Sequence, residues 1–152
     1  MTAPSDPLDS ALALLPHGSE FRFLDGLVEL SPGKSGAARY TLRGDEAFLK
    51  GHFPTDPMLP GVLLVEAGAQ LAGVVAQTDP EIPPLPNLRL TAIRSAKILG
   101  TVRPGESVLI KASITGRFAA LVQAHAEATV GNQTIMTADI ALSGTEKPTA
   151  AA

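Results

Sequence analysis

The sequence predicts an α+β fold in which a six-stranded antiparallel sheet wraps around one long central helix. Several segments alternate apolar and polar residues with the period of two that marks a strand buried on one face. One segment, residues 60–77, is apolar nearly all round and long enough to cover such a sheet. At 152 residues the chain is most economically a single domain.

The predicted strands end at glycine, proline or asparagine signals. They cover residues 23–30, 37–42, 88–98, 108–115, 119–130 and 134–142. Residues 31–36 (SPGKSG) form the expected hairpin turn between the first two. Further turns are expected at residues 103–105, at Gly116 and at residues 131–132. In the fifth strand apolar and polar residues occupy opposite faces, so one face of the sheet needs a cover.

The predicted cover is the helix at residues 60–77 (PGVLLVEAGAQLAGVVAQ). Pro60 suits the first helical turn, and a helix of this length spans about 27 Å. Its alanines and glycines allow close approach to the sheet. Residues 79–86 (DPEIPPLP) cannot continue the helix or form a central strand, and they divide the domain into two halves.

Composition excludes several classes of function. Hydrophobic residues make up 45% and charged residues 18%, as in soluble globular proteins. A net charge of −3 gives no global cationic field, which argues against a nucleic-acid partner. The absence of cysteine excludes disulfides, thiolate nucleophiles and cysteine metal sites.

The termini and the apolar segments predict a cytoplasmic protein that does not insert into membranes. Residues 1–16 lack the basic start of a secretory signal. The longest apolar stretch, residues 61–76, is interrupted by Glu66 and Gln70 and is shorter than the roughly 20 residues of a membrane helix. The domain is expected to cover residues 8–143, with residues 1–7 and 144–152 as disordered tails.

The chain has three histidines, and their contexts differ. His125 lies on the polar face of a predicted strand and is expected to be exposed without a role. His17 lies in a Leu-Pro-His-Gly turn, where we expect it to bond local backbone rather than a substrate. His52 stands in residues 50–54 (KGHFP), whose glycine and proline fix the backbone just ahead of the helix. It is the candidate base; the alternative is a histidine satisfied by a backbone carbonyl.

Glu66 falls in the middle of the apolar helix, where burial of an unpaired carboxylate is costly and favours the protonated acid. Gln70 is four residues further on, and hence on the same face, so it can hydrogen-bond and orient the carboxyl group. The alternative is a Glu–Gln pair that joins helix to sheet, or a buried contact across a dimer.

A protonated carboxylic acid and a neutral imidazole together suit β-elimination from a 3-hydroxyacyl thioester, which needs a base for the C2 proton and an acid for the C3 hydroxyl. Negative charge develops on the thioester oxygen and needs hydrogen-bond donors. The amides of Gly61 and Val62 at the helix start can supply them. No cofactor or metal is expected, since the histidines lack ligand spacing and no glycine-rich phosphate loop follows a strand.

Residues 51–70, GHFPTDPMLPGVLLVEAGAQ, resemble the signature of the bacterial 3-hydroxyacyl-[acyl-carrier-protein] dehydratases. The family pattern is met position by position, including the step of fourteen residues from His52 to Glu66. Residues 14–25 and 92–106 also resemble family segments. Where the family commonly has Arg-Tyr-Pro after its first histidine, this chain has Gly-Ser-Glu at residues 18–20, so an aromatic substrate gate is not carried over.

The resemblance implies a hot-dog fold, with His52 as the catalytic histidine, Glu66 as the catalytic acid and Gly61 as the oxyanion donor. It also implies that His52 and Glu66 come from different subunits of a homodimer or a dimer-based higher oligomer. The implied partner is an acyl carrier protein, which is acidic. Residues 88–120 carry six cations and one acid, and Arg94 and Lys97 are predicted to steer the carrier, the alternative being ordinary solvated strand ends.

The predicted activity is the reversible dehydration of a 3-hydroxyacyl thioester, carried by the acyl carrier protein, to the trans-2-enoyl thioester in fatty-acid or related acyl-chain synthesis. Two alternatives remain. One is a hot-dog acyl thioesterase in which Glu66 activates water or attacks the acyl group. The other is a non-catalytic acyl-binding partner subunit that retains the fold.

Overall fold

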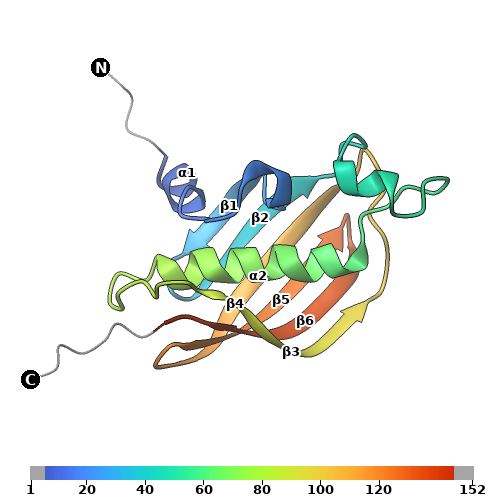
Figure 1. Cartoon of the computed structure of the whole chain (residues 1–152). Coiled ribbons are helices and arrows are strands. Elements are labelled where there is room, and N and C mark those ends of the chain that lie inside the picture. Colours follow the sequence, from blue (N-terminus) through green and yellow to red (C-terminus); the bar gives the residue numbers. More distant parts are fainter. Residues whose placement is uncertain (1–5, 146–152) are drawn as a thin grey trace, which may run out of the picture.

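A curved antiparallel sheet forms one layer of the structure and a long helix lies across its concave face (Figure 1). The computed structural model describes residues 6–145. The strands follow the order β1-β2-β4-β5-β6-β3. Their bounds are β1 Gly26–Ser31, β2 Ser35–Thr41, β3 Arg89–Ile98, β4 Ser107–Phe118, β5 Leu121–Val130 and β6 Gln133–Ser143. The predicted fold class is therefore confirmed.

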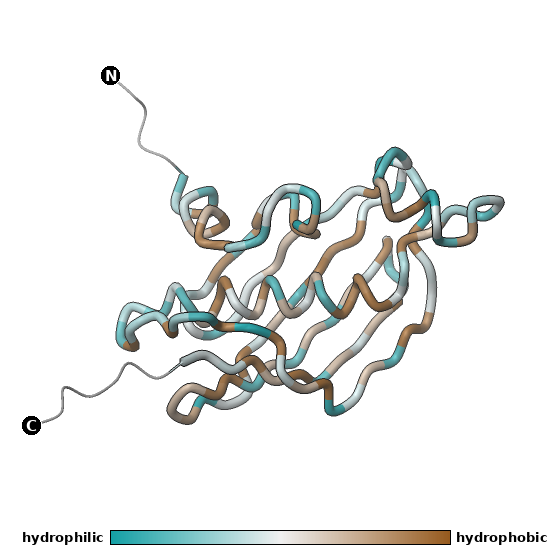
Figure 2. Tube along the Cα trace, in the orientation of Figure 1, coloured by the Kyte–Doolittle hydropathy of each residue, from teal (hydrophilic) through white to brown (hydrophobic). Residues whose placement is uncertain are grey.

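Helix α2 (Gly61–Gln77) packs on the inner face of the sheet because that face is apolar and the helix is lined with small residues. Alternate residues of β5 point toward it and are buried: Val122, Ala124, Ala126 and Ala128. A Cβ atom at Gly68 would stand 2.6 Å from the Cβ of Ala126, so only glycine allows this approach. Figure 2 shows hydrophobic colours along α2 and the strands behind it, with hydrophilic residues gathered in the loops at both ends of the helix.

Two strand boundaries differ by three residues from those that the sequence predicts, the start of β1 and the end of β4, and the others differ by at most two. Phe23 and Leu24 are fully buried, but they precede β1 and are not part of the strand. Gly116 does not form the turn between β4 and β5; it lies inside β4 where the register with β5 shifts. The turn is at Ala119, whose φ of 53° is left-handed. An isolated glycine in a strand can mark a bulge as readily as a turn, and here it marks the bulge.

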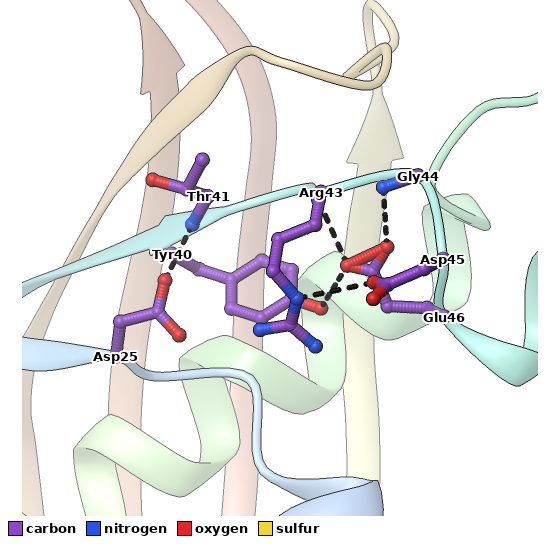
Figure 3. A network of polar contacts seen from close by, with 7 residues as sticks. All are labelled: Asp25, Tyr40, Thr41, Arg43, Gly44, Asp45 and Glu46. Carbon is purple, nitrogen blue, oxygen red and sulfur yellow. Dashed lines mark hydrogen bonds and ion pairs between the residues drawn. The ribbon is translucent and has the colours of Figure 1, made fainter.

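The loop after β2 is fixed by the buried carboxylate of Glu46 (Figure 3). The amides of Arg43 and Gly44 donate to this carboxylate over 2.9 and 2.7 Å, and the Tyr40 hydroxyl donates over 3.4 Å. Burial alone would raise the pKa of Glu46, but the backbone donors outweigh it and the pKa is lowered. The loop leads into the 3₁₀ helix η2 (Ala47–Lys50), so this network anchors the segment that carries His52.

The proline-rich segment after α2 is neither helix nor strand, as predicted, and side chains hold it in place. The side-chain amide of Gln77 donates to the carbonyl of Leu85 over 2.7 Å and accepts from the Leu85 amide over 2.9 Å. The Arg117 guanidinium donates to the carbonyls of Ala76 and Pro83 over 3.1 and 3.4 Å. The segment is thus fixed against the C-terminal end of α2.

Ordered structure extends slightly beyond residues 8–143. Asp6 caps the short helix α1 (Pro7–Leu12), and its carboxylate accepts from the Leu8 amide over 2.9 Å. At the other end the Thr145 amide donates to the carbonyl of Pro86 over 2.8 Å. The rest of the expected tails, residues 1–5 and 146–152, lies outside the described residues. Within residues 6–145, no helix has the length and apolar character needed to cross a membrane.

Candidate active site

His52 lies just after η2 with one ring nitrogen held by the backbone. Its Nδ1 is 3.2 Å from the carbonyl oxygen of Met58. Because a carbonyl can only accept, Nδ1 carries the proton, and in the neutral ring Nε2 has the free lone pair. The ring also makes an edge contact with Phe53, with ring centroids 4.6 Å apart. Phe53 itself has a φ of 46°, a left-handed conformation that is strained for an aromatic residue and that sharpens the turn.

The N-terminus of α2 presents free amides beside the end of β3. Pro60 is the N-cap and offers no side-chain cap, and the amides of Gly61 and Val62 have no hydrogen-bond acceptor within residues 6–145. A Cβ atom at Gly61 would stand 2.9 Å from Cγ2 of Ile98, so a larger residue here would have to displace the Ile98 side chain. The two amides can therefore donate hydrogen bonds to a negatively charged oxygen.

Glu66 lies midway along α2, but it is only partly buried, with 21% of its side chain exposed. Gln70 donates from Nε2 to Oε1 of Glu66 over 3.2 Å, the contact that the spacing of four residues predicts. The same Nε2 donates to the carbonyl of Phe21 over 2.9 Å, and Oε1 of Gln70 accepts from the amide of Phe23 over 2.9 Å. Both the oxygen and the nitrogen of the Gln70 side-chain amide are thus hydrogen-bonded, and they connect Glu66 to the segment that precedes β1.

His17 also contacts Glu66, which the sequence did not predict. Its Nε2 lies 3.3 Å from Oε1 of Glu66, whereas we expected it to bond only local backbone. That expectation is wrong because the turn containing His17 folds back over the middle of α2. The residues are far apart in sequence, so no spacing rule connects them. The available signal was the similarity of residues 14–25 to a family segment that contains a histidine.

A cavity of about 590 Å³ opens next to Glu66 and runs along α2. One face of the helix lines it, with residues at successive three- and four-residue steps: Glu66, Ala69, Gln70, Gly73, Val74 and Gln77. The opposite wall comes from residues 14–17 and from leucines near the ends of β3 and β6. The far end is bordered by Leu85, which Gln77 holds. The cavity is mostly apolar, with an acid at one end.

His52 does not line this cavity, and no contact joins it to Glu66 within one protomer. Arg94 and Lys97 lie on the edge strand β3, where Arg94 occupies an irregularity in the pairing with β6. Neither makes an ion pair with another described residue. Among the other cations between residues 88 and 120, Arg103 pairs with Asp56 and Arg117 donates to backbone carbonyls.

His125 has specific partners, although the sequence suggested only an exposed side chain. It lies on the outer face of the sheet, and its two ring nitrogens contact carboxylates of Asp139 and Glu127 over 2.8 and 3.1 Å. These hydrogen bonds, that to Asp139 first, raise the pKa of His125. No group of three or more potential metal ligands occurs between residues 6 and 145.

The sheet, the helix and the cavity define a protein of the hot-dog class, and solved structures agree. The chain is similar in fold to the dehydratase heterocomplex ApeI:P from Xenorhabdus doucetiae, with a TM-score of 0.75, 18% identity, and 95% of this chain and 94% of that chain covered. It is also similar to zebra fish thioesterase superfamily member 2, with a TM-score of 0.68, 13% identity, and 93% of this chain and all of that chain covered.

Sequence comparison then gives the family. Residues 15–139 match the FabA-like domain. A FabZ 3-hydroxyacyl-[acyl-carrier-protein] dehydratase from Thermoanaerobacter sp. is 34% identical over 88% of this chain and 94% of its own length. Its counterpart in Caldanaerobacter subterraneus subsp. tengcongensis is 35% identical over 84% of this chain and 89% of its own length. The chain belongs to this dehydratase family, as residues 51–70 predicted.

Proposed function

We propose that the chain catalyses the reversible dehydration of a 3-hydroxyacyl thioester, carried by an acyl carrier protein in the cytoplasm, to the trans-2-enoyl thioester. The reaction serves fatty-acid or related acyl-chain synthesis. The observation that carries the proposal is the carboxyl group of Glu66, oriented by Gln70 at the end of an apolar cavity in a chain of the dehydratase family. The names of the relatives support the carrier-bound substrate.

Each group has one task in the reaction. His52, whose Nδ1–H is held by Met58, takes the C2 proton on Nε2. The electron pair of the C2–H bond first moves onto the thioester carbonyl, which becomes enolate-like, and then returns to form the C2=C3 double bond as the C3–O bond breaks. Glu66 donates its proton to the departing hydroxyl, which leaves as water. The amides of Gly61 and Val62 stabilise the negative charge on the thioester oxygen between these events.

The acyl tail extends along the face of α2 that lines the cavity. From Glu66 to Gln77 the helix rises by about 16 Å. An extended chain advances by about 1.2 Å per bond, so this path accepts about 13 bonds beyond the reacting carbons. The small residues Ala69 and Gly73 leave room for the tail, and the segment held by Gln77 and Leu85 borders its end.

The catalytic pair is completed in a homodimer or a dimer-based higher oligomer. Within one protomer His52 and Glu66 lie apart, so a second copy must bring them together. Strand β3 supports this arrangement, since it is an edge strand with Ile93 and Ile98 exposed by 52% and 46%. Val62, at the start of α2, is 74% exposed. Ile98 and Val62 lie where the N-terminus of α2 meets the end of β3, since a Cβ atom at Gly61 would stand 2.9 Å from Cγ2 of Ile98.

The experiment follows enoyl absorbance with purified protein and a crotonyl or 3-hydroxybutyryl thioester. The unmodified chain should interconvert the two, and His52→Ala and Glu66→Gln should each lose nearly all of this activity while remaining dimeric. Near-normal turnover in either variant contradicts the assigned roles. Release of free thiol without enoyl product would instead identify a thioesterase, and no turnover at all would leave an acyl-binding subunit.

Mixing the two inactive variants tests the shared site. In a heterodimer one site combines the intact His52 of one chain with the intact Glu66 of the other, and the second site carries both substitutions. Random exchange makes half of the dimers mixed, so activity should recover to about a quarter of the unmodified level. Recovery requires exchange of subunits, so cross-linked homodimers mixed in the same way serve as the control. No recovery after verified exchange would place both groups in one protomer.

A further inference from the structure

The carboxyl group of Glu66 has a second polar contact that the reaction described above does not use: Nε2 of His17 lies 3.3 Å from its Oε1. We infer that His17 is a positioning residue: it donates from Nε2 to Oε1 of Glu66, and with Gln70 it leaves Oε2 as the atom that exchanges the proton with substrate. This inference rests on the proposed function of Glu66. It assigns to His17 a role in the turnover step rather than in substrate binding.

The tautomer of His17 follows from its surroundings. Its Nδ1 is buried and has no hydrogen-bond partner among residues 6–145. An N–H group on Nδ1 would lack an acceptor there, which is unfavourable, whereas a lone pair costs less to leave unpaired. We therefore place the ring proton on Nε2, the nitrogen that lies 3.3 Å from Oε1 of Glu66.

The position of His17 is fixed by contacts that do not involve the carboxylate. The Arg22 guanidinium donates to the carbonyls of Leu15 and His17, each over 3.3 Å. The ring of Phe21 stacks on the imidazole with centroids 6.2 Å apart and an angle of 25° between the planes.

Two donors on one oxygen give Glu66 a defined orientation throughout the reaction. While the acid is protonated, Oε1 accepts from Gln70 and His17, and the proton resides on Oε2. After the proton leaves with the hydroxyl, the same donors stabilise the carboxylate. The titratable and charged side chains that line the cavity together with Glu66 are His17 from the turn and Arg89 from the start of β3. Of these two, only His17 contacts the carboxyl group within residues 6–145, at 3.3 Å.

The test compares three forms of the full-length protein: unmodified, His17→Phe and His17→Gln. Phenylalanine keeps a ring against Phe21 and removes the donor, whereas glutamine keeps an N–H donor at a similar reach. We expect His17→Phe to lower kcat about tenfold, the effect of losing about 1.4 kcal/mol of transition-state stabilisation, with KM changed less than about twofold. His17→Gln should recover most of kcat. The melting temperatures, measured alongside, show whether each variant is folded.

The outcomes separate this inference from the proposed function. If the unmodified chain dehydrates its substrate and Glu66→Gln does not, the function stands. If His17→Phe then turns over as fast as the unmodified chain, His17 does not position Glu66. Equal losses of kcat in His17→Phe and His17→Gln, with both variants folded, also overturn the inference, because a role in donation predicts recovery by glutamine. If the unmodified chain itself shows no dehydration, it is the proposed function that fails.

Discussion

His125 shows how two partners can set the charge of a single residue far from the cavity. Both of its ring nitrogens face carboxylates, and both can donate at once only when the ring is protonated. Hydrogen bonds to Asp139 and then to Glu127 therefore raise the pKa of His125 above its ordinary value of 6.5. The folded protein thus binds this proton more tightly than the unfolded chain does.

The raised pKa predicts a dependence of stability on pH. The contribution of His125 is fully present below its unfolded pKa and is lost as the pH rises through the folded value. About a third of the side chain is exposed, so the contribution stays below about 1 kcal/mol. The melting temperature of His125→Gln should fall below that of the unmodified chain at about pH 6 and approach it at about pH 9. Asp139→Asn should remove much of the same dependence, and parallel curves for all three proteins would contradict the prediction.

The residues around Glu66 show which part of the candidate site can be predicted from sequence. Gln70 was found because a helix brings residues four apart onto one face. His17 was missed because its contact depends on how a turn before β1 folds over α2. The partial exposure of Glu66 was also missed, since an apolar sequence predicts burial but does not predict a cavity. Local periodicity thus identifies one partner of the carboxyl group and not the other.

At the scale of elements, α2 was predicted well because its pattern is long and its limits are marked by prolines. The structure places its N-cap at Pro60 and its last residue at Gln77. The turn between β4 and β5 was predicted less well, because Gly116 gave a signal that serves bulges and turns alike. Ala119 adopts the left-handed turn conformation although alanine gives no such signal. The pairing with β5, rather than local preference, decides that position.

Gly73 lies halfway along the lining face of α2, and a side chain added there should shorten the cavity. A Cβ atom at Gly73 would meet only Cδ1 of Leu142, at 4.0 Å, so substitution is sterically allowed. We expect Gly73→Leu to lower kcat/KM for a 3-hydroxytetradecanoyl thioester at least about tenfold more than for the 3-hydroxybutyryl thioester, because its side chain occupies the path of the longer tail. Steady-state kinetics with both substrates check this.

Gly73→Ala is the matched control. It adds one methyl group and replaces a helical glycine, which should stabilise the protein by about 0.5–1 kcal/mol and leave the short substrate unaffected. A rise in melting temperature of roughly 1–4 °C is the expected sign. Equal losses of activity on both substrates in Gly73→Leu would mean that the acyl tail does not follow this face of α2.

At the scale of the whole molecule, surface charge should affect how fast the carrier protein binds rather than the rate of the chemical step. The chain has a net charge of −3, so an acidic carrier protein is repelled except near local cations. We propose that Arg94 and Lys97 on the edge strand β3 attract it. The double variant Arg94→Glu/Lys97→Glu should lower kcat/KM roughly tenfold for carrier-bound substrate at low salt and leave a small pantetheine thioester unaffected.

The dependence of kcat/KM on salt concentration in the same variant distinguishes electrostatic attraction of the carrier from a structural defect. The difference from the unmodified chain should shrink at high ionic strength, where charges are screened. Lys111→Glu, on the central strand β4, is the control and should behave like the unmodified chain. Unchanged kinetics of the double variant with the carrier at low salt would remove Arg94 and Lys97 from the proposed contact.

The family and the fold class could be predicted because residues 51–70 and the strand periodicity are features of one chain. The complete site could not, since in the proposed dimer it depends on where the second copy lies. His52 and Glu66 share a signature of neighbouring residues, yet folding carries them to different places in the protomer. Physical argument from the sequence therefore predicts the groups and their chemistry, and the resemblance alone implies that two subunits share them.

The unpaired edge of β3 also affects the risk of aggregation while the protein is being synthesised. A newly folded single copy presents a ten-residue strand with unpaired backbone groups and exposed isoleucines, the features that promote aggregation. The pairing irregularities near residues 91 and 94, together with Arg94 and Lys97, make this edge less receptive to strands of other proteins. Association with an identical copy would then protect the chain in the cell as well as complete its site, and a high local concentration during translation would favour both.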